Sequence, residues 1–181
     1  QVVESPSVMG GSAYKALKIS SNTVFTSYTS SEFTVDQGDI TGFAFDVCFS
    51  ESQHFEASLL CSDFTNNIDP IYIETDPNWD NFYISSGSSV FYGGSYSTSE
   101  KTTLKFRLDS TVNKYDLWVN DELIASGFDF DYNGKTPDRI CFQNSIWDPY
   151  YPSATVYIDN IILGTEKEFE LNSNRFSWQT D

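Results

Sequence analysis

The residues best suited to chemistry are tryptophans and tyrosines set among short polar side chains. Two segments, 76–83 and 145–152, have this composition and lack the alternation typical of strands. The candidates in them are Trp79 in the first and Trp147, Tyr150 and Tyr151 in the second. Sugars present C–H patches that stack on aromatic faces, and exposed aromatic groups often mark interaction sites. Both segments are therefore candidate glycan-binding loops. The alternative is that their rings close the open ends of a folded domain.

A third tryptophan, Trp118, lies within an alternating stretch and shares one face with Asp116 and Asn120. Residues two apart lie on the same side of a strand, so this polar face is expected to point away from the core. If the preceding strand pairs with this one, Lys105 and Arg107 flank the ring. Trp118 and Arg107 form a second candidate glycan-binding surface, as the floor of a concave groove. The alternative is that Trp118 packs beneath a loop.

Alternation of apolar and polar residues dominates the chain, and helical periodicity is nearly absent. Residues 43–49 place three Phe and a Val on one face. A short polar connection leads to the alternating stretch 55–61, which predicts a hairpin with His54 in its turn. Asn120 and Asp121 tolerate positive φ and predict a second, tight hairpin.

Further strands are predicted at 16–19, 32–35, 71–74, 81–85, 90–92, 104–108, 115–119, 122–125, 139–143 and 154–159. Roughly ten to twelve strands, with no helix longer than a turn or two, predict an all-β fold. The expected architecture is a two-sheet antiparallel β-sandwich. Because no linker or internal repeat interrupts the pattern, residues 1–181 are predicted to form a single domain.

The net charge of the chain excludes some classes of binding partner. The chain has 10 Lys and Arg against 26 Asp and Glu, a formal net charge of −16. Such a chain repels nucleic-acid phosphates and anionic membrane surfaces. The charge suits a soluble extracellular domain with neutral or calcium-bridged ligands, so we predict a secreted or cell-surface location. The lack of Asn-x-Ser/Thr acceptors favours a bacterial source.

The three cysteines, Cys48, Cys61 and Cys141, cannot all pair within one chain. Their spacing matches no zinc motif. They are either small buried hydrophobic residues or one disulfide with a free thiol.

Two stretches resemble the concanavalin A-like lectin and glucanase superfamily, including its laminin G-like branch. Residues 104–125, LKFRLDSTVNKYDLWVNDELIA, have its strand, short turn and strand ending in a reversal. Residues 154–164, ATVYIDNIILG, are similar to the last core strand of these jelly rolls and of many carbohydrate-binding modules. The resemblance implies a jelly roll of two curved sheets whose concave face or rim binds sugar.

The resemblance also implies a calcium ion. In the glucanase branch and in many jelly-roll binding modules, the Asp of the last core strand and an acidic residue near the N-terminus hold calcium. Asp159 in YIDNI matches that Asp, and Glu4 is the candidate partner because it lies near the chain start. Calcium takes several oxygen ligands, which an acidic chain supplies. The alternative is that Asp159 is an ordinary strand carboxylate.

The sequence has no recognisable catalytic constellation. The glucanases of this superfamily place alternating carboxylates on one strand, a pattern that does not occur here. The acidic run 166–170 has a different spacing, typical of a solvated face. Jelly-roll lyases use a Tyr with His, Arg or Gln, and His54 stands in a predicted turn. A nucleophile elbow, a phosphate loop and a dinucleotide fingerprint are also absent.

We therefore predict a non-catalytic carbohydrate-binding module that recognises a polysaccharide or glycan. It is expected to be a monomeric domain of a larger secreted or cell-surface protein. The first alternative is an adhesive or structural surface domain that binds a protein partner. The second is a polysaccharide lyase or glycoside hydrolase with an atypical site.

Overall fold

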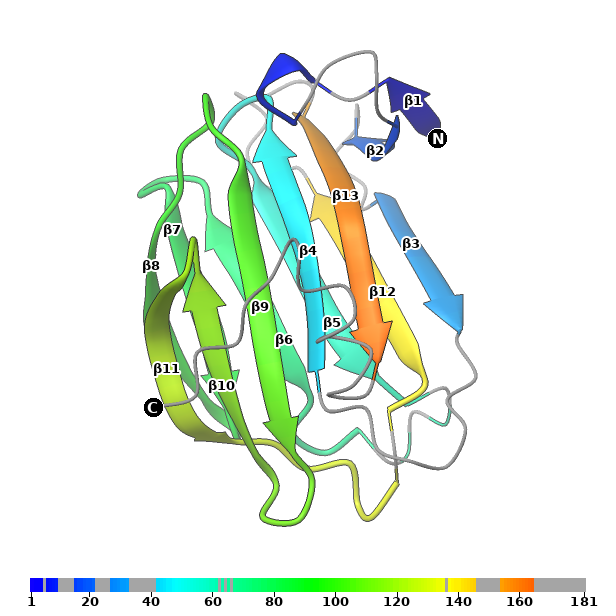
Figure 1. The fold of residues 1–181 in the computed structure, drawn as a ribbon, viewed down its shortest axis with the longest axis vertical. Coiled ribbons are helices and arrows are strands. Elements are labelled where there is room, and N and C mark those ends of the chain that lie inside the picture. The colour runs from blue at the N-terminus through cyan, green and yellow to red at the C-terminus, as the bar shows by residue number, and fades with distance from the viewer. Residues whose placement is uncertain are drawn as a thin grey trace.

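The computed structural model describes residues 1–4, 6–9, 15–21, 27–32, 42–61, 63, 65, 67–135, 137–145 and 154–164. In this part of the chain, two antiparallel sheets pack face to face as a β-sandwich (Figure 1). Its helical structure is limited to short 3-10 turns, of which Ser7–Met9 is one. No helix among these residues is long and apolar enough to cross a bilayer. The predicted all-β jelly roll is confirmed, with an additional first strand.

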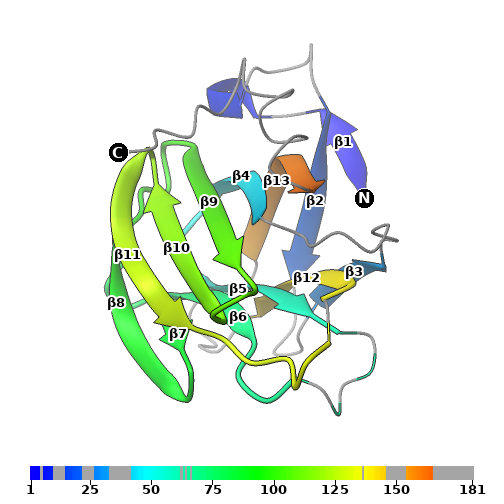
Figure 2. The same ribbon diagram turned by 60° about the horizontal axis from the view of Figure 1, so that its bottom comes forward.

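The two sheets differ in size. The seven-stranded sheet has the order β1-β2-β13-β4-β9-β10-β11, and the six-stranded sheet the order β3-β12-β5-β6-β7-β8. The strands of the first are β1 (Val2–Glu4), β2 (Lys15–Ser21), β13 (Ala154–Gly164), β4 (Gly42–Phe49), β9 (Thr102–Asp109), β10 (Lys114–Val119) and β11 (Glu122–Asp129). Those of the second are β3 (Ser27–Glu32), β12 (Arg139–Ser145), β5 (His54–Leu60), β6 (Ile71–Asp76), β7 (Asn81–Ser86) and β8 (Ser89–Ser95). Figure 2 shows both layers, with β11 and β8 at the same side.

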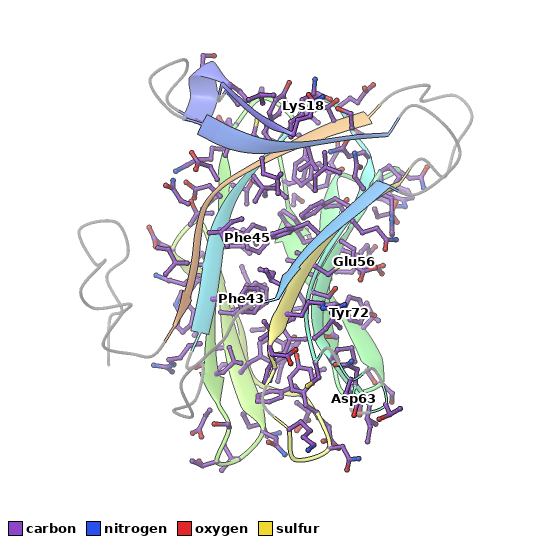
Figure 3. All side chains as sticks on the ribbon, turned by 90° about the vertical axis from the view of Figure 1, so that its right-hand side faces the viewer. Lys18, Phe43, Phe45, Glu56, Asp63 and Tyr72 are labelled. Carbon is purple, nitrogen blue, oxygen red and sulfur yellow. The ribbon has the colours of Figure 1, made fainter. Side chains whose placement is uncertain are left out.

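The core between the sheets is built largely from phenylalanine. Phe43 and Phe45 of β4 point into it, between the two layers (Figure 3). Phe43 stacks on Phe106 of the neighbouring strand with 4.1 Å between ring centroids. Phe45 meets Phe142 of the opposite sheet edge-on, with 5.1 Å between centroids. Edge-on and offset contacts are the favoured geometries for aromatic pairs. The alternation predicted for 43–49 therefore does face the core.

The connection after β4 does not form the predicted hairpin. β4 and β5 belong to different sheets, so residues 50–53 cross from one layer to the other. Ser50 N and Gln53 Nε2 both donate to the carbonyl oxygen of Thr155, at 3.0 and 3.2 Å. The prediction is wrong because β4 already pairs with β13 and β9 along its two edges. Because neither edge of β4 is free, β5 cannot pair with it. β5 lies in the opposite sheet, and its apolar face packs into the core from that side.

The second predicted hairpin is confirmed. β10 and β11 pair directly, and Val119 lies opposite Glu122. The two turn residues, Asn120 and Asp121, have φ values of 49° and 66°. These values belong to the left-handed region that a two-residue hairpin turn requires, and Asn and Asp tolerate that region better than most residues.

A buried tyrosine, Tyr132, connects the segment after β11 to the six-stranded sheet. Its hydroxyl donates to Leu59 O at 2.6 Å and accepts a hydrogen bond from Ile71 N at 3.0 Å. Burial raises the pKa of this hydroxyl, so it stays a donor at neutral pH. The two bonds satisfy backbone groups of both β5 and β6.

Replacing Tyr132 with Phe should lower the free energy of unfolding by about 1–3 kcal/mol, because buried backbone groups of Leu59 and Ile71 lose their partner. Urea denaturation followed by tryptophan fluorescence measures the loss. Tyr92→Phe is the control, because the Tyr92 hydroxyl bonds to Ser95 Oγ at an exposed position, at 3.1 Å. Equal losses in both variants would contradict this account of Tyr132.

Candidate functional site

A row of polar and aromatic side chains crosses the outward face of the six-stranded sheet. Its members are Gln143 of β12, Glu56 of β5, Glu74 of β6, Tyr83 of β7 and Tyr92 of β8. Each lies directly opposite the next in the strand register. On β12, β5, β6 and β7 the residues that alternate with the row are buried in the core, so the row points outward. We call these five residues the tyrosine–glutamate row.

Figure 3 shows this face from the side. Glu56 points away from the core, and so does Tyr72, which lies two residues before Glu74 on β6. The sequence already contained the signal for this face, in the alternation of polar residues along each strand. What it lacked was the pairing of these strands, which brings the polar positions together.

His54 lies on the same face. It is the first residue of β5 and stands two positions before Glu56, so both side chains leave the strand on one side. His54 Nε2 is 3.4 Å from Glu74 Oε2, and the imidazole is largely covered. The predicted position of His54 in a hairpin turn is wrong, because the crossing from β4 ends at Gln53.

Glu56 and Glu74 form an acidic pair at the centre of the face. Side chains directly opposite on neighbouring strands have Cβ atoms about 4.5–5.5 Å apart, and like charges in such a pair are unfavourable. Burial raises the pKa of Glu56, a hydrogen bond from Ser58 and the nearby His54 oppose this, and the charge of Glu74 raises it further. Burial raises the pKa of Tyr72, and both glutamates add to that shift. The centre of this face is therefore electronegative.

The other end of the row is aromatic and open to solvent. Tyr92 is 59% exposed on the edge strand β8. Its ring meets that of Tyr83 edge-on, with 6.5 Å between centroids. The Tyr92 hydroxyl bonds to Ser95 Oγ, which donates to Asn81 Oδ1 at 2.9 Å. These contacts hold the ring in place while its surface remains available to a ligand.

Trp79 lies at the end of the same two strands. It stands in the turn between β6 and β7 and is 71% exposed, so it does not close the end of the sandwich. Asp76 and Asn81 flank the turn and lie opposite each other. Each is two residues along its strand from Glu74 or Tyr83, so both are the next positions on the same outward face. The predicted exposure of Trp79 is confirmed, and the turn continues the face that carries the row.

Trp118 lies on the opposite side of the molecule, on the outward face of the seven-stranded sheet. Lys105 Nζ and Arg107 Cζ lie 5.6 and 5.4 Å from its ring centroid, which confirms the predicted flanking. Arg107 Nη2 also donates to Asp116 Oδ2 at 2.5 Å. Cations near the face of a tryptophan ring attract it. In this position they also occupy space that a sugar stacked on the ring would need.

Trp118 belongs to the seven-stranded sheet and Trp79 follows a strand of the six-stranded sheet, so the structure does not bring the two rings together.

The other predicted loop residues, Trp147, Tyr150 and Tyr151, lie outside the described residues. β12 ends at Ser145 and β13 begins at Ala154, on either side of them. Their part in binding stays a prediction.

Asp159, the predicted calcium ligand, lies on β13 among other polar side chains. Asp159 lies opposite Asp46, and its Oδ1 accepts a hydrogen bond from Asn160 N at 2.7 Å. Asp46 Oδ2 is bound by Lys101 Nζ at 2.9 Å, and β2 separates the strand of Glu4 from that of Asp159. Within the described ranges, no group of three or more His, Cys, Asp and Glu could hold a metal ion. These residues do not by themselves fit calcium, and calcium at Asp159 and Glu4 stays a prediction.

All three cysteines fall within the described residues, and none forms a disulfide. Cys48 and Cys61 are buried, and Cys141 is half-buried. Burial raises the pKa of each thiol, that of Cys61 to about 11, so all three stay protonated at neutral pH. This favours the interpretation as small hydrophobic residues.

Glu56 should lower the free energy of unfolding as the pH rises, the opposite of the effect of a carboxyl group whose pKa is lowered by folding. Because its pKa is raised in the folded state, the folded protein binds this proton more tightly than the unfolded chain. Its contribution to stability should therefore grow as the pH falls through the range just above 4.5 and be lost as the pH rises. Glu56→Gln should gain melting temperature relative to the native protein at pH 7, and the gain should shrink towards pH 4.

Thermal melts across this pH range test the prediction. Glu122→Gln is the control, because it removes the same charge at an exposed position of β11. A difference between Glu56→Gln and the native protein that does not vary with pH, or that varies equally in the control, would contradict it.

No protein-family model matches the sequence, and no curated protein sequence matches it. Solved structures match the fold. A sialidase has a TM-score of 0.67 at 13% identity over 85% of this chain, which spans only 16% of the sialidase chain. The carbohydrate-binding module CBM66 from Bacillus subtilis has a TM-score of 0.53 at 11% identity, over 91% of each chain.

The catalytic domain of a laminarinase from Thermotoga petrophila has a TM-score of 0.58 at 10% identity, over 82% of this chain and 76% of that domain. At such low identities, likeness extends to the fold and not to the function. The described residues of this chain thus share the jelly-roll β-sandwich fold of these proteins.

Proposed function

We propose that this protein is a non-catalytic carbohydrate-binding domain whose ligand lies along the outward face of the six-stranded sheet. The observation that carries the proposal is the tyrosine–glutamate row, which places the exposed Tyr92 ring and the half-buried Tyr83 ring beside carboxylates and an amide. Trp79 extends the surface at the end of β6 and β7. The domain would act in a secreted or cell-surface protein, as the acidic composition suggests.

The chemistry of the face suits a sugar. The Tyr92 ring and the exposed Trp79 ring offer apolar faces to the C–H patches of a pyranose or furanose. Gln143 and the two glutamates offer acceptors and donors for hydroxyl groups, since a binding site combines apolar surface with a few fixed polar groups. CBM66 and a tetrameric galectin from a ball sponge, with a TM-score of 0.50 at 14% identity, share the fold. Their names support glycan binding as the kind of function.

A glycoside hydrolase is the second candidate. The observation that favours it is the direct opposition of Glu56 and Glu74 on neighbouring strands. Glycosidases use two carboxyl groups on either side of the scissile bond. Release of reducing ends from bound polysaccharide would distinguish this activity from binding alone.

Trp79→Ala and Tyr92→Ala should each weaken glycan binding about two- to tenfold, because an aromatic contact contributes about 0.5–1.5 kcal/mol beyond area burial. Their melting temperatures should stay close to that of the native protein, since both rings are exposed. A glycan-array screen followed by affinity gels measures the loss.

Trp118→Ala is the control on the opposite sheet and should keep its glycan affinity. The proposal fails if no glycan is retained by the native protein. It also fails if binding survives in both Trp79→Ala and Tyr92→Ala, or if Trp118→Ala alone loses binding without losing stability.

A further inference from the structure

We infer that the tyrosine–glutamate row selects glycans that carry free amino groups, and that Glu56 and Glu74 are its specificity-determining residues. The inference rests on the proposed function and names the chemical class of its ligand. An amino sugar stacked on the tyrosine rings would place its ammonium group against the glutamate pair.

The first step is the separation of charge between the two outward faces. Besides Lys15, five basic residues lie on or beside strands of the seven-stranded sheet, and four of them are paired with carboxylates there. These pairs are Lys101–Asp46, Lys105–Asp121, Arg107–Asp116 and Lys114–Asp129. The fifth, Lys18, lies over the Tyr157 ring at 5.9 Å from its centroid. These cations are therefore engaged on the side of the sandwich that faces away from the row.

The second step concerns the cations that do reach the six-stranded sheet. Arg139 begins β12, four positions before Gln143, and a strand rises about 3.3 Å per residue. Its backbone is thus roughly 13 Å along the strand from the row. His54 faces the pair, and its Nε2 lies 3.4 Å from Glu74 Oε2. Among the described residues, the ion pairs of the basic side chains do not include Glu56.

The third step is the geometry of the pair. Glu56 and Glu74 oppose each other directly, an arrangement that is unfavourable for like charges and that a cation between them relieves. Partial burial makes the attraction less screened than on an open surface. Burial raises the pKa of Glu56, and the charge of Glu74 adds to this shift against the opposing effects of Ser58 and His54.

The fourth step is the spacing between the rings and the pair. Neighbouring strands lie about 4.8 Å apart, so Tyr83 is one strand from Glu74 and two from Glu56. A glycan that stacks on Tyr92 and Tyr83 and runs across the strands would carry its next substituents over the two carboxylates. Amino groups gain an ion pair there. Uronates, sialic acids and sulfated sugars meet two like charges and are disfavoured.

Calorimetric titration of the whole chain with two hexasaccharides tests the inference. The first is a β-1,4-linked glucosamine hexamer with free amines, and the second is the fully N-acetylated hexamer. Both titrations are run at about pH 6, below the pKa of about 7.7–8.0 of an ordinary α-amino group, so that the amines carry positive charge. We expect the native protein to bind the free-amine hexamer at least about tenfold more tightly, with a preference that weakens at high salt.

Glu56→Gln combined with Glu74→Gln should remove this preference, because it removes the two negative charges that attract the ammonium groups while keeping side chains that can bond to hydroxyl groups. The matched control is Glu100→Gln combined with Glu122→Gln, which removes the same net charge at exposed positions outside the six-stranded sheet. The control should keep the preference. Equal affinity for the two hexamers in the native protein, or a preference that persists in the Glu56/Glu74 variant, overturns the inference.

The proposed function is judged separately. If a hexamer or an arrayed glycan binds without any preference for amines, and Tyr92→Ala weakens that binding, the face is a glycan site and only the amine selectivity is wrong. If the amine preference is lost equally in both double variants, it comes from the net charge of −16 and not from the pair, which also overturns the inference.

Discussion

The structure depends on the burial of phenylalanine rings between two sheets. Phe45 of the seven-stranded sheet and Phe142 of the six-stranded sheet meet edge-on, and Phe55 packs against both of them. Because these rings must face inward, each strand that carries one has its register fixed with respect to the core. A shift of one residue would move every side chain of that strand to the other face.

This constraint also determines the outer surfaces. Residues that alternate with the buried rings have to face outward, and on β5, β6 and β7 those positions hold glutamates and tyrosines. The two outer faces then differ in chemistry. On the seven-stranded sheet, Trp118 is surrounded by cations that are paired with carboxylates. On the six-stranded sheet, two carboxylates oppose each other beside exposed rings.

Likeness to other sandwiches does not choose between these two faces. The solved structures that match include a sialidase, a binding module, a galectin and a laminarinase, at identities of 10–14%. One fold therefore serves both binding and hydrolysis, and function depends on the groups that a particular face presents. For this chain, the exposure of Trp79 and Tyr92 and the opposition of Glu56 and Glu74 favour the six-stranded sheet.

The sequence by itself determined most of the strands, because alternation is a local property that repeats every two residues. It did not predict β1, and it predicted a strand at 32–35, whereas β3 spans Ser27–Glu32. It also determined the tight turn at Asn120 and Asp121, whose positive φ suits those residue types. Only the tertiary structure decided that β5 leaves β4 for the opposite sheet and that Gln143, Glu56 and Glu74 share one row. Strand pairing joins residues far apart in the chain, and the partner of each strand depends on how the whole core packs. The alternation within one segment does not indicate which other segment will pair with it.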